Sequence, residues 1–214
     1  PEMRGLCLVT DRGLCGDRLL EDVVMQAVQG GVACVQLREK GLCTRAFVEE
    51  AARIKALLSP VNVPLIINDR VDVALAVGAD GVHVGQSDMP CEFVRHLMGP
   101  AAIIGLSVET WEDVVRAQDQ PVDYLGVSPV FNTLTKTNTR SAWGLQGLAR
   151  IRAYSRHPLV AIGGVNAANI ADVVRAGAEG IAVVSAICSA TDPRRAATSM
   201  YRRIQDGAQA PSPK

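Results

Sequence analysis

A short run near residue 36 holds the most chemically suggestive spacing in the chain. Gln36, Arg38 and Lys40 lie two residues apart, directly after an apolar run. Side chains two apart in a β-strand point to the same face, so a strand that persisted to residue 40 would gather one amide and two cations. Neighbouring cations repel unless an anion lies between them, so an anion-binding site is one interpretation of this run. An exposed edge strand with solvated charges is the alternative.

Two aspartates follow later apolar runs and could bind a metal ion. Asp69 ends the run PLIIND, and Asp88 follows the run GVHVGQ. If the two strands are neighbours, the carboxylates meet, and such a pair suits Mg²⁺, which also takes phosphate oxygens and water. Each aspartate could instead cap the helix that follows it. Nearby cations favour a magnesium–diphosphate site over two caps. These cations are Arg38, Lys40 and Lys136.

A second anion site is predicted near the end of the chain. Gly163 and Gly164 follow one apolar run, and Val184 and Ser185 follow the next. Loops after the last two strands of α/β barrels often bind phosphate through backbone N–H groups, and glycine permits close approach. An ordinary glycine turn, with Asn166 capping the next helix, is the alternative, and both descriptions can hold together.

The segment 131–142 is polar, rich in threonine and longer than most loops between a strand and a helix. Thr133, Thr135 and Lys136 can donate hydrogen bonds to anions. We interpret the segment as a lid over a substrate. A loop without a role is the alternative.

Eight apolar runs alternate with amphipathic segments and must position these residues. Most runs are continuously apolar, which is typical of strands buried on both faces of a parallel sheet. The predicted strands are 6–11, 33–39, 64–69, 81–86, 102–108, 124–130, 159–164 and 180–186. The predicted helices are 19–29, 45–58, 71–77, 91–98, a helix after the N-cap Thr110, 146–154, 167–176 and 193–206.

Eight strand–helix units in about 200 residues predict one domain, a (β/α)₈ TIM barrel over residues 1–206. A glycine just past three of the helices, in QGGVA, VGADG and AGAEG, would end each one in a left-handed conformation. A doubly wound open sheet is the alternative, but the first strand lacks its glycine-rich phosphate loop. Residues 207–214 are expected to be a disordered tail. In a TIM barrel, the predicted polar residues fall at the carboxyl ends of the strands, and we expect nothing comparable at the opposite face.

Composition gives no support for some classes of partner. The 214 residues carry 22 basic and 22 acidic side chains, which favours neither nucleic-acid nor membrane-surface binding. No apolar run approaches the roughly 18 residues needed to cross a bilayer, and the N-terminus lacks the apolar core of a secretion signal. The six cysteines form no Cys-x-x-Cys pair, and we read them as reduced and structural, as in the cytoplasm.

The histidines do not point to nucleophilic catalysis. His83 lies inside a predicted strand, where we expect it to pack or to form hydrogen bonds within the barrel. Neither a Ser-His-Asp nor a Cys-His arrangement is evident in the sequence.

The order and spacing of several short motifs resemble the thiamine phosphate synthase family over nearly the whole chain. The matching pieces are QLREK (36–40), INDR (67–70), GVHVGQSD (81–88), GLS (105–107), SPVFNTLTK (128–136), WGLQGL (143–148), IGGV (162–165) and VVSAI (183–187). The resemblance implies a transferase that joins a hydroxymethylpyrimidine diphosphate to a thiazole phosphate and releases pyrophosphate.

The resemblance also implies roles for individual residues. Those expected at the pyrimidine diphosphate are Gln36, Arg38, Lys40, Asn68, Ser107 and Lys136. Those expected at the thiazole phosphate are Thr133, Thr135, Gly164, Val184 and Ser185. Catalytic roles fall to Arg38, Lys40, Ser107 and Lys136, and Asp69 and Asp88 would hold Mg²⁺. Gln36, one step deeper than the cations, should read the pyrimidine ring, whereas Glu39 should lie outside the site.

Two positions depart from the usual pattern of that family. Ser128 stands where glycine is common, and Glu109 stands where histidine often follows the serine of the fifth strand. A thiazole tautomerase on the same barrel is therefore one alternative, with Glu109 as its base, although it would not need the diphosphate residues. A non-catalytic phosphate-binding regulator is the other. The expected partners are small molecules, without nucleic acid or membrane, and a homodimer is left open.

Overall fold

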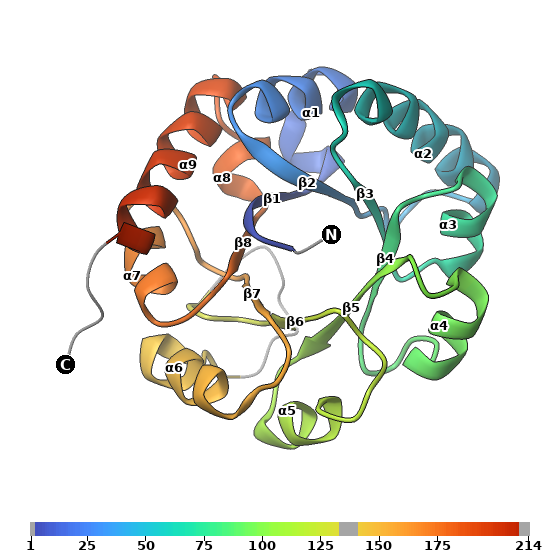
Figure 1. Ribbon diagram of the computed structural model, residues 1–214. Coiled ribbons are helices and arrows are strands. Elements are labelled where there is room, and N and C mark those ends of the chain that lie inside the picture. Colours follow the sequence, from blue (N-terminus) through green and yellow to red (C-terminus); the bar gives the residue numbers. More distant parts are fainter. Residues whose placement is uncertain (1–2, 133–140, 210–214) are drawn as a thin grey trace.

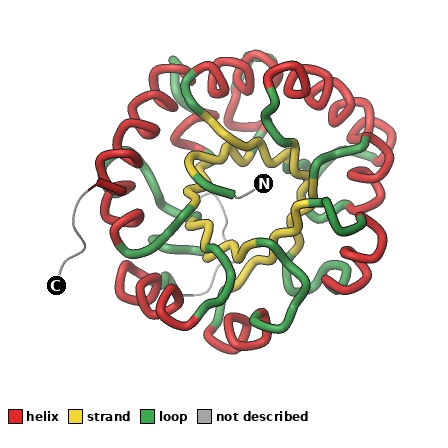
Figure 2. The backbone as a smooth tube through the Cα atoms, viewed as in Figure 1, coloured by secondary structure: helices red, strands yellow, loops and turns green. Residues whose placement is uncertain are grey.

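The computed structural model describes residues 3–132 and 141–209 and forms a closed barrel of parallel strands in the order β1 to β8. The strands form an inner ring, and the helices form an outer ring around it (Figures 1 and 2). Each strand pairs in parallel with the next, and β8 returns to β1. The predicted TIM barrel is confirmed, and the open sheet is excluded.

All eight predicted strands are present, but several end earlier than predicted. Their bounds are β1 Gly5–Val9, β2 Val32–Leu37, β3 Leu65–Asn68, β4 Gly81–Val84, β5 Ile103–Val108, β6 Tyr124–Val127, β7 Leu159–Ala161 and β8 Gly180–Val183. Because β2 ends at Leu37, the alternation of side chains in a strand does not apply to Arg38 and Lys40. The Arg38 N–H instead donates to the side-chain Oγ1 of Thr10 at 3.0 Å, which ends the backbone ladder there.

The helices lie close to their predicted positions. They are α1 Leu20–Gln29, α2 Thr44–Leu58, α3 Val71–Val77, α4 Cys91–Met98, α5 Trp111–Ala117, α6 Gly144–Tyr154, α7 Ile170–Arg175, α8 Ser185–Cys188 and α9 Pro193–Gln209, with 3₁₀ turns η1 Arg12–Cys15 and η2 Ser59–Val61. Thr110 caps α5, as predicted, by accepting from the Asp113 N–H at 3.1 Å. The short helix α8 was not predicted. The predicted start of the tail at residue 207 is wrong, because α9 continues to Gln209 and buries Gly207 against Ala171 and Val174.

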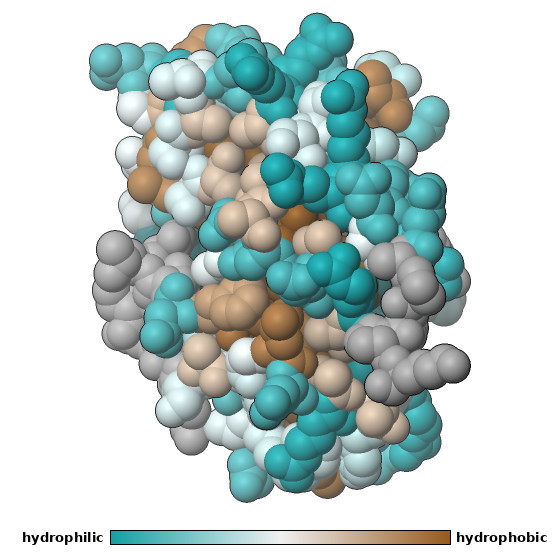
Figure 3. All heavy atoms as spheres, turned by 90° about the vertical axis from the view of Figure 1, so that its left-hand side faces the viewer, coloured by the Kyte–Doolittle hydropathy of each residue, from teal (hydrophilic) through white to brown (hydrophobic). Residues whose placement is uncertain are grey.

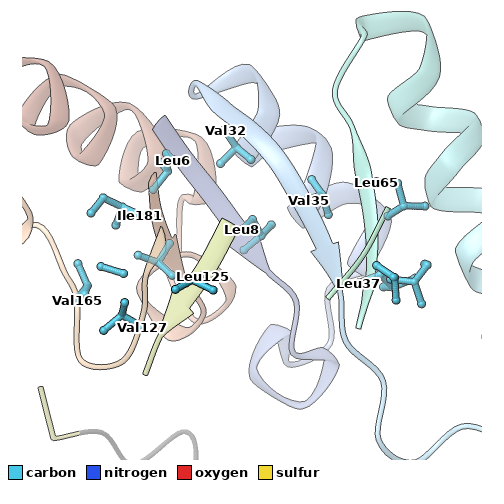
Figure 4. Packing of buried hydrophobic residues seen from close by; sticks show 14 of the residues in the cluster. Leu6, Leu8, Val32, Val35, Leu37, Leu65, Leu125, Val127, Val165 and Ile181 are labelled. Atoms are coloured by element: carbon cyan, nitrogen blue, oxygen red, sulfur yellow. The ribbon is translucent and has the colours of Figure 1, made fainter. Parts of the chain in front are cut away.

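Two apolar layers hold the barrel together, because alternate residues of each strand face opposite sides. Leu6, Leu8 and Val35 point outward into the layer between strands and helices (Figure 4). Cys7, Cys34, Met3 and other side chains fill the barrel interior. Polar groups cover much of the outer face on the side of α7 and α9, with smaller apolar areas between them (Figure 3). All six cysteines are free thiols.

Acidic residues at the amino-terminal ends of three strands form a repeated set of contacts, which corrects our expectation for this face. Each accepts a hydrogen bond from a backbone N–H at or near the start of the preceding strand, and also pairs with a basic side chain of an earlier helix. The sets are Asp80 with Leu65 N and Lys55, Asp123 with Ile104 N and Arg95, and Glu179 with Leu159 N and Arg152. These contacts connect each strand to a helix and to the next strand at the amino-terminal ends of the strands.

The predicted glycine turns are confirmed. Gly31, Gly78 and Gly177 have φ values of 105°, 61° and 107°, and each follows a helix in the three matching joints. Among the described residues, no helix is both long and apolar enough to cross a membrane.

Candidate active site

One large cavity opens at the carboxyl ends of the strands and extends into the barrel interior, with a volume of about 1070 Å³. Nearly every site residue predicted from the sequence lines this cavity. These residues are Gln36, Arg38, Lys40, Asn68, Asp69, Asp88, Ser107, Gly164, Val184 and Ser185. Thr133, Thr135 and Lys136 lie outside the described residues. The structure therefore shows that these residues share one cavity, and their individual roles stay predictions.

Asp69 lies just past β3 and belongs to a wall of charged groups. Its Oδ2 atom lies 2.5 Å from Nζ of Lys40, in the loop after β2. The backbone of Asp69 is left-handed, with φ of 64°, and its N–H donates to the carbonyl of His83 at 2.8 Å. Such a conformation is uncommon outside glycine, and it persists where surrounding contacts enforce it, often at functional sites. Since Arg70 holds the position before α3, the capping alternative for Asp69 is wrong.

Asp88 faces the same cavity from the loop after β4. Its Oδ2 atom accepts a hydrogen bond from the Gly85 N–H at 2.7 Å, and Pro90 holds the position before α4, so the capping alternative is wrong here also. Burial raises the pKa of Asp88 above its ordinary value, against the lowering effect of the Gly85 hydrogen bond, and the charge of Asp69 raises it further. The two carboxylates are therefore close enough to interact and favour a cation between them.

The chemistry of this pair fits Mg²⁺. No group of three His, Cys, Asp or Glu side chains with metal-binding geometry occurs in the described part of the chain. Two carboxylates alone suit Mg²⁺, because this ion usually keeps several waters and takes phosphate oxygens from a substrate. Zinc, which takes three or four protein ligands, would be a poor match.

The loops after β7 and β8 form the opposite wall of the cavity. Gly163 and Gly164 have φ values of 95° and 67°. A Cβ atom on Gly163 would come within 2.7 Å of Pro129, and one on Gly164 within 2.7 Å of Phe131, so other residues would not fit. Ser185 begins α8 directly after this wall, and the first N–H groups of a helix lack partners within the helix.

The alternative for the glycine turn predicted that Asn166 caps the next helix, but Asn166 does not do so. Its Oδ1 atom accepts from the Ala168 N–H at 2.8 Å and closes a local turn, whereas α7 begins after Asn169. Gly163 and Gly164 themselves line the cavity, so their backbone lies beside it.

The floor of the cavity contains a polar link that the sequence did not reveal. His83 of β4 bonds through Nδ1 to the Tyr124 hydroxyl of β6 and through Nε2 to the Ser107 hydroxyl of β5, each at 2.8 Å. His83 is 8% exposed and Tyr124 is 1% exposed, so the hydrogen bond between them is buried, whereas the one to Ser107 is partly buried. The expectation that His83 forms hydrogen bonds within the barrel is confirmed. Tyr124 was missed because nothing in its own apolar run marks it as a cavity residue.

The two positions that depart from the family pattern both line the cavity. Ser128 is buried after β6, and the N–H of Glu109 donates to the Asp113 carboxylate at 3.1 Å. Glu39, in contrast, lies outside the cavity lining, as expected, with its Oε1 atom 3.7 Å from Nε of Arg12.

Comparison with known proteins places this site in a family. A family model described as thiamine monophosphate synthase matches residues 6–187. Thiamine-phosphate synthase of Albidiferax ferrireducens is 57% identical over 199 residues, covering 93% of this chain and 91% of that protein. Thiamine-phosphate synthase of Leptospira biflexa is 52% identical over 207 residues, covering 95% of this chain and 99% of that protein.

Solved structures agree with the sequence comparisons. A thiamine phosphate pyrophosphorylase from Pyrococcus furiosus superposes with a TM-score of 0.88 at 36% identity, covering 97% of this chain and 98% of that one. A 3-hexulose-6-phosphate synthase reaches a TM-score of 0.67 at 21% identity, which shows a shared fold alone. With its fold, the contents of its cavity and relatives of this similarity, the chain belongs to the thiamine monophosphate synthase family.

Proposed function

We propose that this protein is a thiamine phosphate synthase, a transferase. It joins 4-amino-2-methyl-5-(diphosphooxymethyl)pyrimidine to 4-methyl-5-(2-phosphooxyethyl)thiazole and releases thiamine phosphate and pyrophosphate. The observation that carries the proposal is a single cavity with two walls suited to anions. One lies after β2, β3 and β4, and the other lies after β7 and β8, across the closed barrel. A reaction of two phosphorylated substrates needs two such walls.

The charged wall suits the diphosphate. Arg38 and Lys40 supply cations, and the Asp69–Asp88 pair would hold Mg²⁺ beside them. Bound Mg²⁺ would neutralise negative charge as the pyrophosphate leaves. Lys136, from the predicted lid, would add a third cation. These groups stabilise the leaving charge electrostatically, which is often the largest single contribution to catalysis.

The reaction requires no protein nucleophile. The bond from the pyrimidine methylene carbon to the diphosphate oxygen breaks, and both electrons leave with pyrophosphate. The electron-rich aminopyrimidine stabilises the resulting cation, and the thiazole nitrogen then forms the new carbon–nitrogen bond. The protein's task is to hold the two reactants in line, which alone can contribute several kcal/mol to lowering a barrier.

The glycine-rich wall suits the phosphate of the thiazole. Gly164, Val184 and Ser185 lie there, and Thr133 and Thr135 of the lid would complete the site. Backbone N–H groups at such a turn bind phosphate without adding a charged side chain.

One assay tests this function against both alternatives. The purified protein is mixed with the two substrates and Mg²⁺, and thiamine phosphate and pyrophosphate are measured. The proposal expects both products in equal amounts and their loss when the metal is chelated. A tautomerase would instead rearrange the thiazole phosphate alone, with Glu109 as the candidate base, and a regulator would yield no product. A folded protein without product would overturn the proposal.

The cytoplasm is the proposed location, since the free cysteines suit a reducing compartment. Whether two copies associate as a homodimer stays a hypothesis, which sedimentation of the purified protein would test.

A further inference from the structure

The buried pair His83–Tyr124 joins three neighbouring strands beneath the cavity. His83 and Tyr124 both lie opposite Gly105 in the strand register, one on β4 and the other on β6. A Cβ atom on Gly105 would lie 2.4 Å from Nδ1 of His83 and 2.1 Å from Cζ of Tyr124. The hydrogen bond between the two rings therefore passes directly over Gly105. A second glycine, Gly126, makes room for the other edge of the imidazole, 2.8 Å from its Cε1 atom.

A neutral imidazole with a hydroxyl at each nitrogen allows two arrangements, because only one nitrogen carries hydrogen. In the first, Tyr124 donates to Nδ1, and Nε2–H donates to Ser107. In the second, Nδ1–H donates to Tyr124, and Ser107 donates to Nε2. Only the first leaves the Ser107 hydrogen free to bond a ligand. The second leaves Ser107 as an acceptor.

The surroundings of Tyr124 favour the first arrangement. Burial keeps this phenol protonated by raising its pKa well above the ordinary value, so it retains a hydrogen to donate. The Gln36 side chain, which lines the same cavity, acts in the opposite direction on the pKa of this phenol, as a donor facing its oxygen would. Among the described residues, Nδ1 of His83 is the hydrogen-bond partner of this buried hydroxyl, so the phenol directs its own hydrogen there.

We propose that His83 and Tyr124 are positioning residues that fix Ser107 as a hydrogen-bond donor and Gln36 as an acceptor, so that the cavity selects an aminopyrimidine over its 4-oxo counterpart. An aminopyrimidine carries an amine donor beside a ring-nitrogen acceptor, the pattern complementary to Gln36 and Ser107. The 4-oxo form carries a carbonyl acceptor beside an N–H donor and would oppose both groups. This inference takes the class of substrate from the proposed function. It adds which residues make the cavity select the aminopyrimidine.

The tautomer of His83 gives a test that needs no activity. Nitrogen-15 NMR of histidine-labelled protein, near neutral pH, should show hydrogen on Nε2 and none on Nδ1. His157 is an internal reference, because its Nε2 lies 3.0 Å from the carbonyl of Ala117 and must donate to it. The variant His83→Gln assigns the signal. Hydrogen on Nδ1 of His83 would overturn the proposal.

Ligand binding gives the second test. Dissociation constants are measured with Mg²⁺ for the aminopyrimidine diphosphate and its 4-oxo analogue, so that differences in reactivity do not enter. The wild type should favour the amino form by roughly a hundredfold or more, because the 4-oxo form would leave two polar groups of the cavity unpaired. Tyr124→Phe and Ser107→Ala should each reduce that ratio by about tenfold or more. His83→Gln, which keeps a donor near Nε2, should retain more of the ratio than His83→Leu.

The controls separate a positioning role from a structural one. Tyr154→Phe removes the same hydroxyl from an exposed tyrosine and should leave the ratio unchanged. A variant that only loosens the barrel should weaken the binding of both ligands equally and leave the ratio of their dissociation constants unchanged. An unchanged ratio in folded Tyr124→Phe, or equal binding of both ligands by the wild type, would overturn the inference. Selective binding without thiamine phosphate formation would instead overturn the proposed function and leave the inference standing.

Discussion

Nζ of Lys40 lies 2.5 Å from Oδ2 of Asp69, and this contact links the loop after β2 to the residue that follows β3. The two side chains were assigned to different partners, Lys40 to phosphate and Asp69 to the metal, yet they form one wall. Each compensates the charge of the other, and Asp88 lies close enough to respond to Asp69. The residues proposed for the diphosphate and those proposed for Mg²⁺ therefore form a single electrostatic unit.

Asp69→Asn should lower turnover without unfolding the protein. Asparagine tolerates the left-handed backbone at this position, whereas alanine would add strain. Loss of one charge-stabilising group should reduce kcat by about 10²–10³-fold, while the melting temperature stays near that of the wild type. Lys136→Ala should behave in the same way. Steady-state kinetics at saturating Mg²⁺ and thermal unfolding are the measurements.

Asp72→Asn is a matched control for that variant. Asp72 is a nearby, exposed aspartate that pairs with Arg70 at the start of α3, outside the cavity lining. Its replacement should leave turnover unchanged. Near-normal turnover in both Asp69→Asn and Lys136→Ala would show that the metal and leaving-group assignments are wrong.

Gly105→Ala should damage both stability and activity. The new methyl group would overlap the buried rings of His83 and Tyr124, which have no flexible end that could move aside. Overpacking of this kind costs about 1–3 kcal/mol in the free energy of unfolding, measured by urea denaturation. Activity should fall further than stability explains, because the rings must separate. Gly41→Ala, where a Cβ atom would meet nothing within 4 Å, is the control and should be nearly neutral. A fully active Gly105→Ala would contradict the described packing.

Asp123→Ala should lower stability and spare turnover. Its carboxylate accepts from the Ile104 N–H and from Arg95, each at 2.7 Å, far from the cavity mouth. Loss of the acceptor leaves a strand N–H unpaired, which costs about 1–3 kcal/mol in the free energy of unfolding. Asp119→Ala is the control. Asp119 is 84% exposed and lies 3.4 Å from Arg156, and exposed ion pairs contribute little to the free energy of unfolding. Equal stability of the two variants would show that the contact does not support the barrel.

The barrel could be predicted because its signal is local. Buried parallel strands read as continuous apolar runs, and glycines such as Gly78 mark helix ends. The strand ends were less predictable. Whether β2 continues past Leu37 depends on Thr10, the residue that follows β1, whose side chain accepts from the Arg38 N–H.

The cavity residues could also be predicted in part, because a TIM barrel brings the carboxyl ends of its strands together. The link between His83 and Tyr124 could not, since it depends on the register of strands 41 residues apart. The contacts of Asp80, Asp123 and Glu179 were missed for the same reason. Each acid precedes one strand and bonds to the start of another, so its own sequence neighbourhood carries no sign of the partner.

Glu39→Gln should stabilise the protein at neutral pH and lose that effect in acid. Burial raises the pKa of Glu39 above its ordinary value of 4.5, the charge of Glu50 raises it further, and Arg12 opposes both. The folded state therefore binds the proton more tightly than the unfolded state does. The contribution of Glu39 to stability is therefore greatest below about pH 4.5 and falls as the pH rises through the folded-state pKa. Glutamine resembles the protonated carboxyl and does not titrate, so the variant does not lose this stability as the pH rises.

The difference in unfolding free energy between Glu39→Gln and the wild type should thus grow from near zero in acid to a plateau above the folded-state pKa. Urea denaturation at a series of pH values between about 4 and 8 measures it, over the range where this carboxyl titrates. Glu49→Gln, an exposed site on α2, should show a flat difference. A difference of the opposite sign, with the wild type gaining relative stability as pH rises, would mean that Arg12 outweighs both burial and the charge of Glu50.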